Sequence, residues 1–175
     1  MSRHLITVNR KIMVRRVFFS FHFDRDHWRV NQVRNSLLTQ DDRESAGYID
    51  AADWESLKRQ GDDVIKRWIN DQMKGTSVTA VLIGQETYDR DWVEYEIKKS
   101  WRDGNGIVGI RIHNLEDKSG YTDSRGKNPL SKIYIEENGQ KKFFDDIFST
   151  YRWKRDSGYD NLGDWVEEAA QIAGR

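Results

Sequence analysis

The sequence predicts an α/β fold in which a parallel β-sheet is covered by helices on both faces. The first observation is a nearly unbroken apolar run over residues 78–83, because a strand that is buried on both faces needs no polar alternation. The second is the order of the elements, since strand-like segments alternate along the chain with amphipathic helical segments. Parallel strands joined in this way require right-handed crossover connections.

The first strand and the first helix lie close to the start of the chain. Segment 15–21 is β-branched and aromatic, which predicts a strand. Apolar residues then recur at helical spacing over 30–37, and Asp24 or Asp26 is predicted to cap that helix. The chain therefore opens with a βα unit.

The next stretch is expected to form the flexible wall of a ligand site. Residues 39–61 are polar and irregular in pattern, apart from a short candidate strand at 48–51 and a loop that opens at 53–54. An amphipathic helix is predicted over 64–73, and Gly75 stands where a left-handed residue would end it.

The helix after the central strand carries the candidate catalytic residue. Asp91 and Glu94 have the spacing of a reciprocal capping pair, so the helix is expected to begin near Trp92. Four residues share the face predicted to pack on the sheet: Val93, Ile97, Ser100 and Trp101. Glu96 falls beside this face, near the strand ends where open α/β sheets bind ligands. It is either a solvated residue paired with Lys99 or a carboxylate aimed at that site.

The glycines at 104, 106 and 109 match the dinucleotide pattern G-x-G-x-x-G, but the context is wrong. A phosphate-binding loop follows a strand and opens a helix, whereas here a helix precedes the glycines and a strand at 107–113 follows. We therefore predict a tight turn and no cofactor loop.

The chain beyond residue 114 is predicted to be an extension of the same domain. Asn138-Gly139 is a strong hairpin turn, and the hairpin is expected to cover one edge of the sheet. A terminal helix behind Asn161 presents its apolar face through Leu162, Trp165, Val166, Ala169 and either Ile172 or Ala173. The predicted organisation is a leader at 1–14 and one domain at 15–175, with the extension starting at about 114.

Composition excludes several classes of function. Lysine and arginine number 29, as do aspartate and glutamate, so no overall field favours nucleic acid or an anionic membrane. Cysteine is absent and the four histidines lack metal-binding spacing, so no metal site is predicted. No segment resembles a signal peptide or a membrane span, and we expect a cytoplasmic protein.

Several segments together resemble the TIR-like proteins of the Thoeris antiphage defence system. They are RVFFSFH (16–22), RVNQVRN (29–35), AGYIDAADWE (46–55), TSVTAVLIG (76–84), DWVEYEIKKS (91–100) and RWKRDSGYDNLGDWV (152–166). Within them, WVEYEI is similar to the W-C-x-x-E-L motif of NAD-cleaving Toll/interleukin-1 receptor (TIR) domains. Val93 replaces the cysteine of that motif, and Glu96 falls on its glutamate.

The resemblance implies a flavodoxin-like enzyme that cleaves the nicotinamide–ribose bond of NAD and makes a cyclic ADP-ribose-type signal. NAD is its substrate, and no cofactor is expected. The implied partners are a phage-derived trigger, an effector reached through the diffusible nucleotide, and a second copy of the chain through self-association. Glu96 is the implied catalytic residue, and the implied substrate-binding residues are Phe21, His22, Asp50, Trp54 and Trp92.

Two other readings of the same fold remain open. One is a non-catalytic TIR-like module that binds a protein partner. The other is a nucleoside-processing transferase, because such enzymes also place a carboxylate beyond a parallel strand. Release of nicotinamide from NAD distinguishes the NAD-cleaving enzyme from both of these alternatives.

Overall fold

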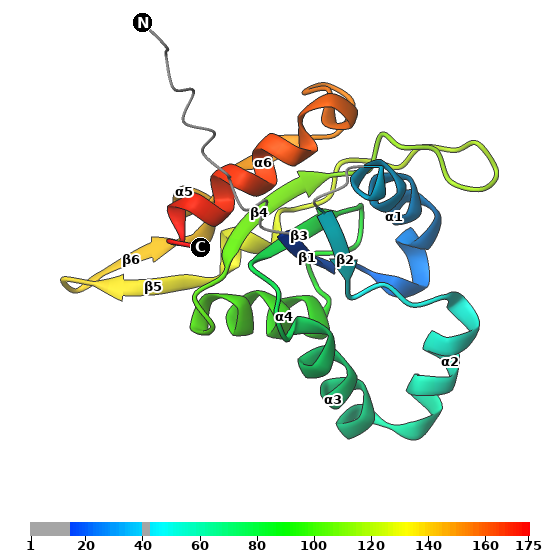
Figure 1. Cartoon of the computed structure of the whole chain (residues 1–175), viewed down its shortest axis with the longest axis horizontal. Helices are drawn as coiled ribbons and strands as arrows, with labels where there is room; N and C mark the ends of the chain where they lie inside the picture. Colours follow the sequence, from blue (N-terminus) through cyan, green and yellow to red (C-terminus); the bar gives the residue numbers. More distant parts are fainter. Residues whose placement is uncertain (1–14, 40–42) are drawn as a thin grey trace, which may run out of the picture.

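The computed structural model describes residues 15–39 and 43–175, and the predicted leader lies outside them. Within these residues a five-stranded parallel sheet has the strand order β2-β1-β3-β4-β7 (Figure 1). Its strands are β1 (Arg15–Ser20), β2 (Arg43–Ala46), β3 (Val78–Ile83), β4 (Gly106–Arg111) and β7 (Thr150–Arg152). The predicted α/β class with a parallel, flavodoxin-like sheet is confirmed.

The central strand is the one that the apolar run predicts. All six residues of β3 are buried, and the strand pairs with β1 on one side and β4 on the other. Both faces of the sheet are covered, since α1 (Phe23–Leu38) and α6 (Gly158–Ile172) lie on one face and α3 (Asp62–Met73) and α4 (Asp91–Arg102) on the other (Figure 1). Gly75, with φ of 74°, follows α3 as predicted.

The region predicted to be irregular contains a helix and a different strand. Residues 48–51 do not form a strand; β2 lies earlier, and the chain then enters α2 (Ala51–Gln60). Trp54 is buried inside this helix instead of opening a loop. The hydrophobic content of 39–61 is low, so the periodicity of α2 gives only a weak signal, and its one large apolar anchor is Trp54.

The predicted caps of two helices are wrong. Helix α4 begins at Asp91 itself, after Arg90, and no side chain caps it. Glu94 instead forms ion pairs with Lys98 at 2.6 Å and Lys132 at 3.3 Å, which a solvent-facing carboxylate can reach more readily than a backbone amide. In α1 the N-cap residue is likewise uncapped, and both predicted capping aspartates lie inside the first turn.

The buried faces of α4 and α6 are close to those predicted, with exceptions at their ends. Trp101 is 41% exposed and Ile172 is 66% exposed, so neither belongs to the core. Gly104, with φ of 73°, makes the tight turn between α4 and β4, and a side chain at Gly106 would collide with the backbone of Ala169 in α6. These glycines serve the turn and the packing of α6 on β4.

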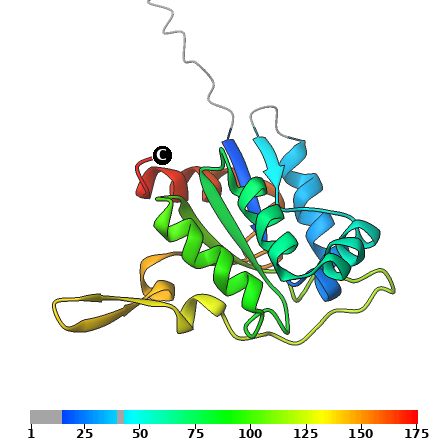
Figure 2. The same cartoon turned by 90° about the horizontal axis from the view of Figure 1, so that it is seen from below.

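The extension forms a hairpin, but the hairpin does not cover the sheet. Strands β5 (Tyr134–Glu137) and β6 (Gln140–Phe143) are joined by Asn138 and Gly139, which both have positive φ as predicted. They form a separate two-stranded sheet that projects from the domain (Figure 2). Strand β7 forms the edge instead; it follows the short helix α5 (Phe144–Ile147), and the 3-10 helix η1 (Pro129–Lys132) precedes the hairpin.

Candidate active site

The main cavity lies where the connections of the sheet change direction. β1 and β3 are neighbours in the sheet, but the chain leaves them toward opposite edges, and such switch points create a crevice beyond the strand ends. A cavity of about 730 Å³ occupies this position, which we call the β1–α4 cavity. Its lining residues are Phe21, His22, Phe23, Asp24, Trp54, Lys58, Asp62, Ile65, Asp89, Arg90, Asp91, Trp92, Val93 and Tyr95.

One wall of the β1–α4 cavity is aromatic. The ring centroids of Phe21 and Phe23 are 4.1 Å apart, and the rings of Phe23 and Trp54 stack at 4.4 Å. The indole N–H of Trp54 donates to Asp24 at 3.0 Å, which fixes the plane of that ring. A rigid aromatic wall of this kind suits a planar heterocycle.

The other side of the cavity carries charged groups. Lys58 lies 2.7 Å from Asp24. Burial raises the pKa of Asp24, but the hydrogen bonds from Lys58 and Trp54, together with the charges of Lys58 and His22, outweigh it and lower the pKa. Arg90 approaches the ring of His22 at 3.5 Å. Burial, and then the charge of Arg90, lower the pKa of His22, so its imidazole is neutral near pH 7. The charged side therefore holds two cations, Lys58 and Arg90, among four aspartates, and Lys58 is already paired with Asp24 and Glu55.

Glu96 lies directly behind the wall of this cavity. It is 1% exposed, and the residues one turn earlier on α4, Trp92 and Val93, line the cavity. Its carboxyl accepts a hydrogen bond from Ser20, the residue before the lining residue Phe21. Burial raises the pKa of Glu96 to about 8, although the Ser20 hydrogen bond acts in the opposite direction.

The interpretation of Glu96 as a solvated residue paired with Lys99 is wrong. Lys99 pairs with Asp103 at 2.9 Å, and Glu96 is among the most buried polar residues described. A buried carboxyl with a raised pKa beside a cavity is typical of a functional site.

A family model described as "Thoeris protein ThsB, TIR-like domain" matches residues 18–117, which run from the middle of β1 to just beyond β4 and include the lining of the β1–α4 cavity and Glu96. The chain belongs to the ThsB TIR-like family. A relative from Bacillus cereus (strain MSX-D12) is 36% identical over 191 aligned positions, which cover 88% of this chain and all of the relative. Its name is "Putative cyclic ADP-D-ribose synthase ThsB1".

Within this ThsB-family domain, the predicted site residues separate into two groups. Phe21, His22, Trp54 and Trp92 line the β1–α4 cavity. Asp50 does not: it is exposed and caps α2 by accepting a hydrogen bond from the backbone N–H of Asp53 at 2.9 Å. Asp50 therefore has a structural role as the cap of α2, the helix that carries the cavity residue Trp54.

Sequence reasoning missed ten of the fourteen cavity residues, three of which bear on ligand binding, and the partner of Glu96. Phe23, Lys58 and Arg90 line the cavity, and Ser20 binds the carboxyl. Lys58 belongs to a helix that the pattern did not reveal. Ser20 offered a usable signal, because it precedes the end of the first strand and parallel strands bring their carboxyl ends to one edge of the sheet.

Two further structural findings bear on the chemistry. Among the residues described, no three His, Cys, Asp or Glu side chains are grouped so that they could hold a metal ion. In the same part of the chain, no helix is both long and apolar enough to cross a membrane.

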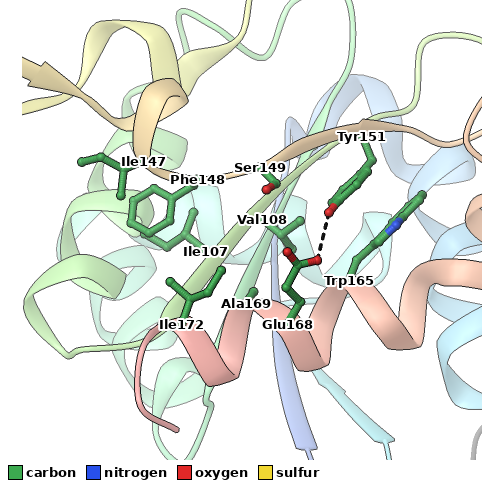
Figure 3. A pocket seen from close by; sticks show the side chains of 10 residues that line it. All are labelled: Ile107, Val108, Ile147, Phe148, Ser149, Tyr151, Trp165, Glu168, Ala169 and Ile172. Atoms are coloured by element: carbon green, nitrogen blue, oxygen red, sulfur yellow. Dashed lines mark hydrogen bonds between the residues drawn. The ribbon is translucent and has the colours of Figure 1, made fainter.

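A second cavity, between β4, β7 and α6, is too small for a ligand (Figure 3). Its volume of about 10 Å³ matches the space of at most one water molecule. Tyr151 stacks on Trp165 with centroids 4.3 Å apart and donates to Glu168 at 3.1 Å. This slot is a packing feature of the edge strand.

Proposed function

We propose that this chain cleaves NAD at the nicotinamide–ribose bond and forms a cyclic ADP-ribose-type product as an antiphage signal. The observation that carries the proposal is the Glu96 carboxyl, buried behind the wall of a cavity that has an aromatic side and a charged side containing Lys58 and Arg90. The cyclic ADP-ribose synthase name of the relative supports the same reaction.

The two sides of the β1–α4 cavity match the two chemical parts of NAD. The stacked pair of Phe23 and Trp54 suits the flat nicotinamide or adenine ring. Lys58 and Arg90 suit the pyrophosphate, because ammonium and guanidinium groups bind phosphate oxygens through charge-assisted hydrogen bonds. NAD acts here as the substrate, and no further cofactor is invoked.

A single carboxylate is sufficient for the proposed cleavage. Nicotinamide leaves as a neutral molecule from a cationic pyridinium, so its departure needs no general acid. Positive charge then develops on the ribose, as in other glycosidic bond cleavages. Ionised Glu96 would stabilise this cation and hold the ribose hydroxyls, while a hydroxyl of the ADP-ribose part attacks to close the ring.

The resting structure is not arranged for this step. Glu96 is closed off behind Trp92 and Val93, and burial keeps its carboxyl mostly protonated near pH 7. We therefore include activation in the proposal: a phage-derived trigger, or self-association, shifts the population toward a state in which Glu96 is ionised and faces the cavity. The cyclic product then reaches its effector by diffusion through the cytoplasm.

A second candidate function is a TIR-like interaction module without catalysis. The observation that favours it is the same closed and protonated Glu96, which could be a permanent feature of a protein that never opens. The nucleoside-processing transferase has no comparable observation in its favour.

The test is incubation of the full chain with NAD, with and without lysate from phage-infected cells, followed by separation of nicotinamide and the nucleotide product. We expect little turnover alone, and trigger-dependent release of nicotinamide with a cyclic product. Release of linear ADP-ribose alone would contradict the cyclisation step. Failure to release nicotinamide under any condition would favour the interaction module, and base exchange on free nucleosides would favour the transferase.

A further inference from the structure

Three arginine side chains meet at the carboxyl ends of β4 and β7, away from the β1–α4 cavity. Arg111 ends β4, Arg152 ends β7, and the two are paired in the register of the parallel strands, so both side chains leave the same face of the sheet. Arg125 joins them from the loop after β4. Together they line a separate cavity of about 500 Å³. We call the three residues the arginine site.

No carboxylate of the described residues neutralises the arginine site. Arg111 donates to the backbone carbonyl of Gly126 at 2.7 Å, but it forms no ion pair. Asp145 and Asp146 line the same cavity, yet both are exposed and neither pairs with an arginine. Burial, and then the charges of the other two arginines, lower the pKa of Arg111.

The fold treats its other buried arginines differently. Arg15 binds Glu167 at 3.0 Å, and Arg29 binds Asp123 at 2.8 Å. Like Arg111, both are less than a tenth exposed. In a chain with equal numbers of acidic and basic residues, a buried arginine beside two like charges and without an acid is costly unless a ligand supplies the negative charge.

We propose that the arginine site binds a small anion that carries a phosphate or pyrophosphate group. Guanidinium groups present parallel N–H donors whose spacing fits two oxygens of one phosphate, and three of them can surround it. The two exposed aspartates at the same cavity repel a long polyanion such as nucleic acid, so the ligand is compact.

The arginine site adjoins the loop that shapes the β1–α4 cavity without sharing residues with it. Gly126 packs so tightly that a Cβ there would lie 2.2 Å from the carbonyl oxygen of Gly84. Gly84 begins the loop that continues to Asp89 and Arg90, which line the β1–α4 cavity. Anion binding at the arginine site is nevertheless independent of NAD cleavage, so either can fail alone.

The test is calorimetric titration of the full chain with sodium pyrophosphate at low ionic strength. We expect saturable binding to one site, which Arg125→Gln and Arg152→Gln each weaken by about tenfold through loss of a charge-assisted hydrogen bond. The matched control is Arg155→Gln, because Arg155 is exposed like Arg125 and lies three residues from Arg152, and the substitution removes the same charge. This control is expected to bind as the wild type does.

A further variant tests the geometry of the site. Arg111→Lys keeps the charge but loses the planar guanidinium and its hydrogen bond to the Gly126 carbonyl, so we expect weaker pyrophosphate binding and a lower melting temperature, with binding compared well below that temperature. The proposal is overturned if the wild type shows no saturable binding of pyrophosphate. It is also overturned if Arg155→Gln weakens binding as much as Arg125→Gln and Arg152→Gln do, because the anion would then respond only to the overall positive charge of the surface. Loss of binding in Arg90→Gln but not in Arg152→Gln would also overturn it, because the anion would then occupy the β1–α4 cavity.

Discussion

Asp26 of α1 and Glu96 of α4 are the two fully buried carboxyl groups among the residues described, and the fold holds them in different ways. Asp26 lies 3.4 Å from the buried guanidinium of Arg29, which also binds Asp123 and donates to the backbone carbonyl oxygen of Leu115. Glu96 has no cation and receives only the hydroxyl of Ser20.

The pKa values follow this difference. Burial raises the pKa of Asp26 to about 6, with Arg29 opposing the rise, whereas the pKa of Glu96 rises to about 8. A cation stabilises the ionised form of the first carboxyl, which ties the loop after β4 to α1. Glu96 has no cation beside it, which lowers stability at neutral pH but leaves its carboxyl free of an ion-pair partner, as a catalytic group requires.

The largest expected effect is the loss of turnover in Glu96→Gln, which keeps the shape of the side chain but cannot ionise. Under activating conditions, nicotinamide release is expected to fall by about two orders of magnitude or more, equivalent to about 3 kcal/mol of transition-state stabilisation. Glu94→Gln is the matched control, because it makes the same change on the solvent side of the same helix. Equal rates for Glu96→Gln and the wild type would remove the catalytic assignment.

Asp26→Asn is expected to change stability as its primary effect. The folded pKa of Asp26, about 6, lies above its ordinary value of 3.8, so folding disfavours its ionised form at pH 7. The neutral amide removes that cost while Asp123 still pairs with Arg29, so the free energy of unfolding should rise by about 2 kcal/mol. Urea denaturation measures this, with Asp71→Asn as the control, because the Asp71–Lys74 pair is exposed. If both variants were equally stable, the buried charge of Asp26 would cost no more than that of a surface carboxylate.

The pH dependence of stability separates the two carboxyls further. The folded pKa of Glu96, about 8, lies above its ordinary value of 4.5, so its stabilising contribution is complete below pH 4.5 and is lost as the pH rises through 8. Wild type should lose stability relative to Glu96→Gln across this window, by at most about 1.4 kcal/mol per pH unit. Denaturation of both proteins at several pH values measures the difference, and parallel curves would show that the Glu96 charge is compensated.

The smallest effect is expected for Ser20→Ala, which removes the one hydrogen bond to Glu96. Stability should fall by about 1 kcal/mol or less, and the pKa of Glu96 should rise further because its ionised form loses a donor. The part of this stability loss that depends on pH should vanish when Ser20→Ala is made in Glu96→Gln, and a double-mutant cycle measures it. Persistence of that part would mean that Ser20 acts through another group.

The central strand and the hairpin turn could be predicted from the sequence because each depends on a local pattern. The apolar run of β3 and the positive-φ turn at Asn138-Gly139 both lie where the sequence predicts them. β7 and α2 were not predicted, because three residues carry little periodicity and α2 has a single buried anchor, Trp54. For the site, the family resemblance implied Phe21, His22, Trp54 and Trp92, which do line the cavity, and Asp50, which does not.

By itself, the sequence determined the α/β class, the central position of β3 and the candidate status of Glu96, since strand burial and helix periodicity act between near neighbours in the chain. Only the tertiary structure decided that Glu96 is sealed against Ser20 with a raised pKa, whereas Asp26 is buried beside a cation. It also decided that Arg111, Arg125 and Arg152 share one cavity. Burial and charge pairing depend on which distant segments the sheet brings together, and no local pattern encodes that.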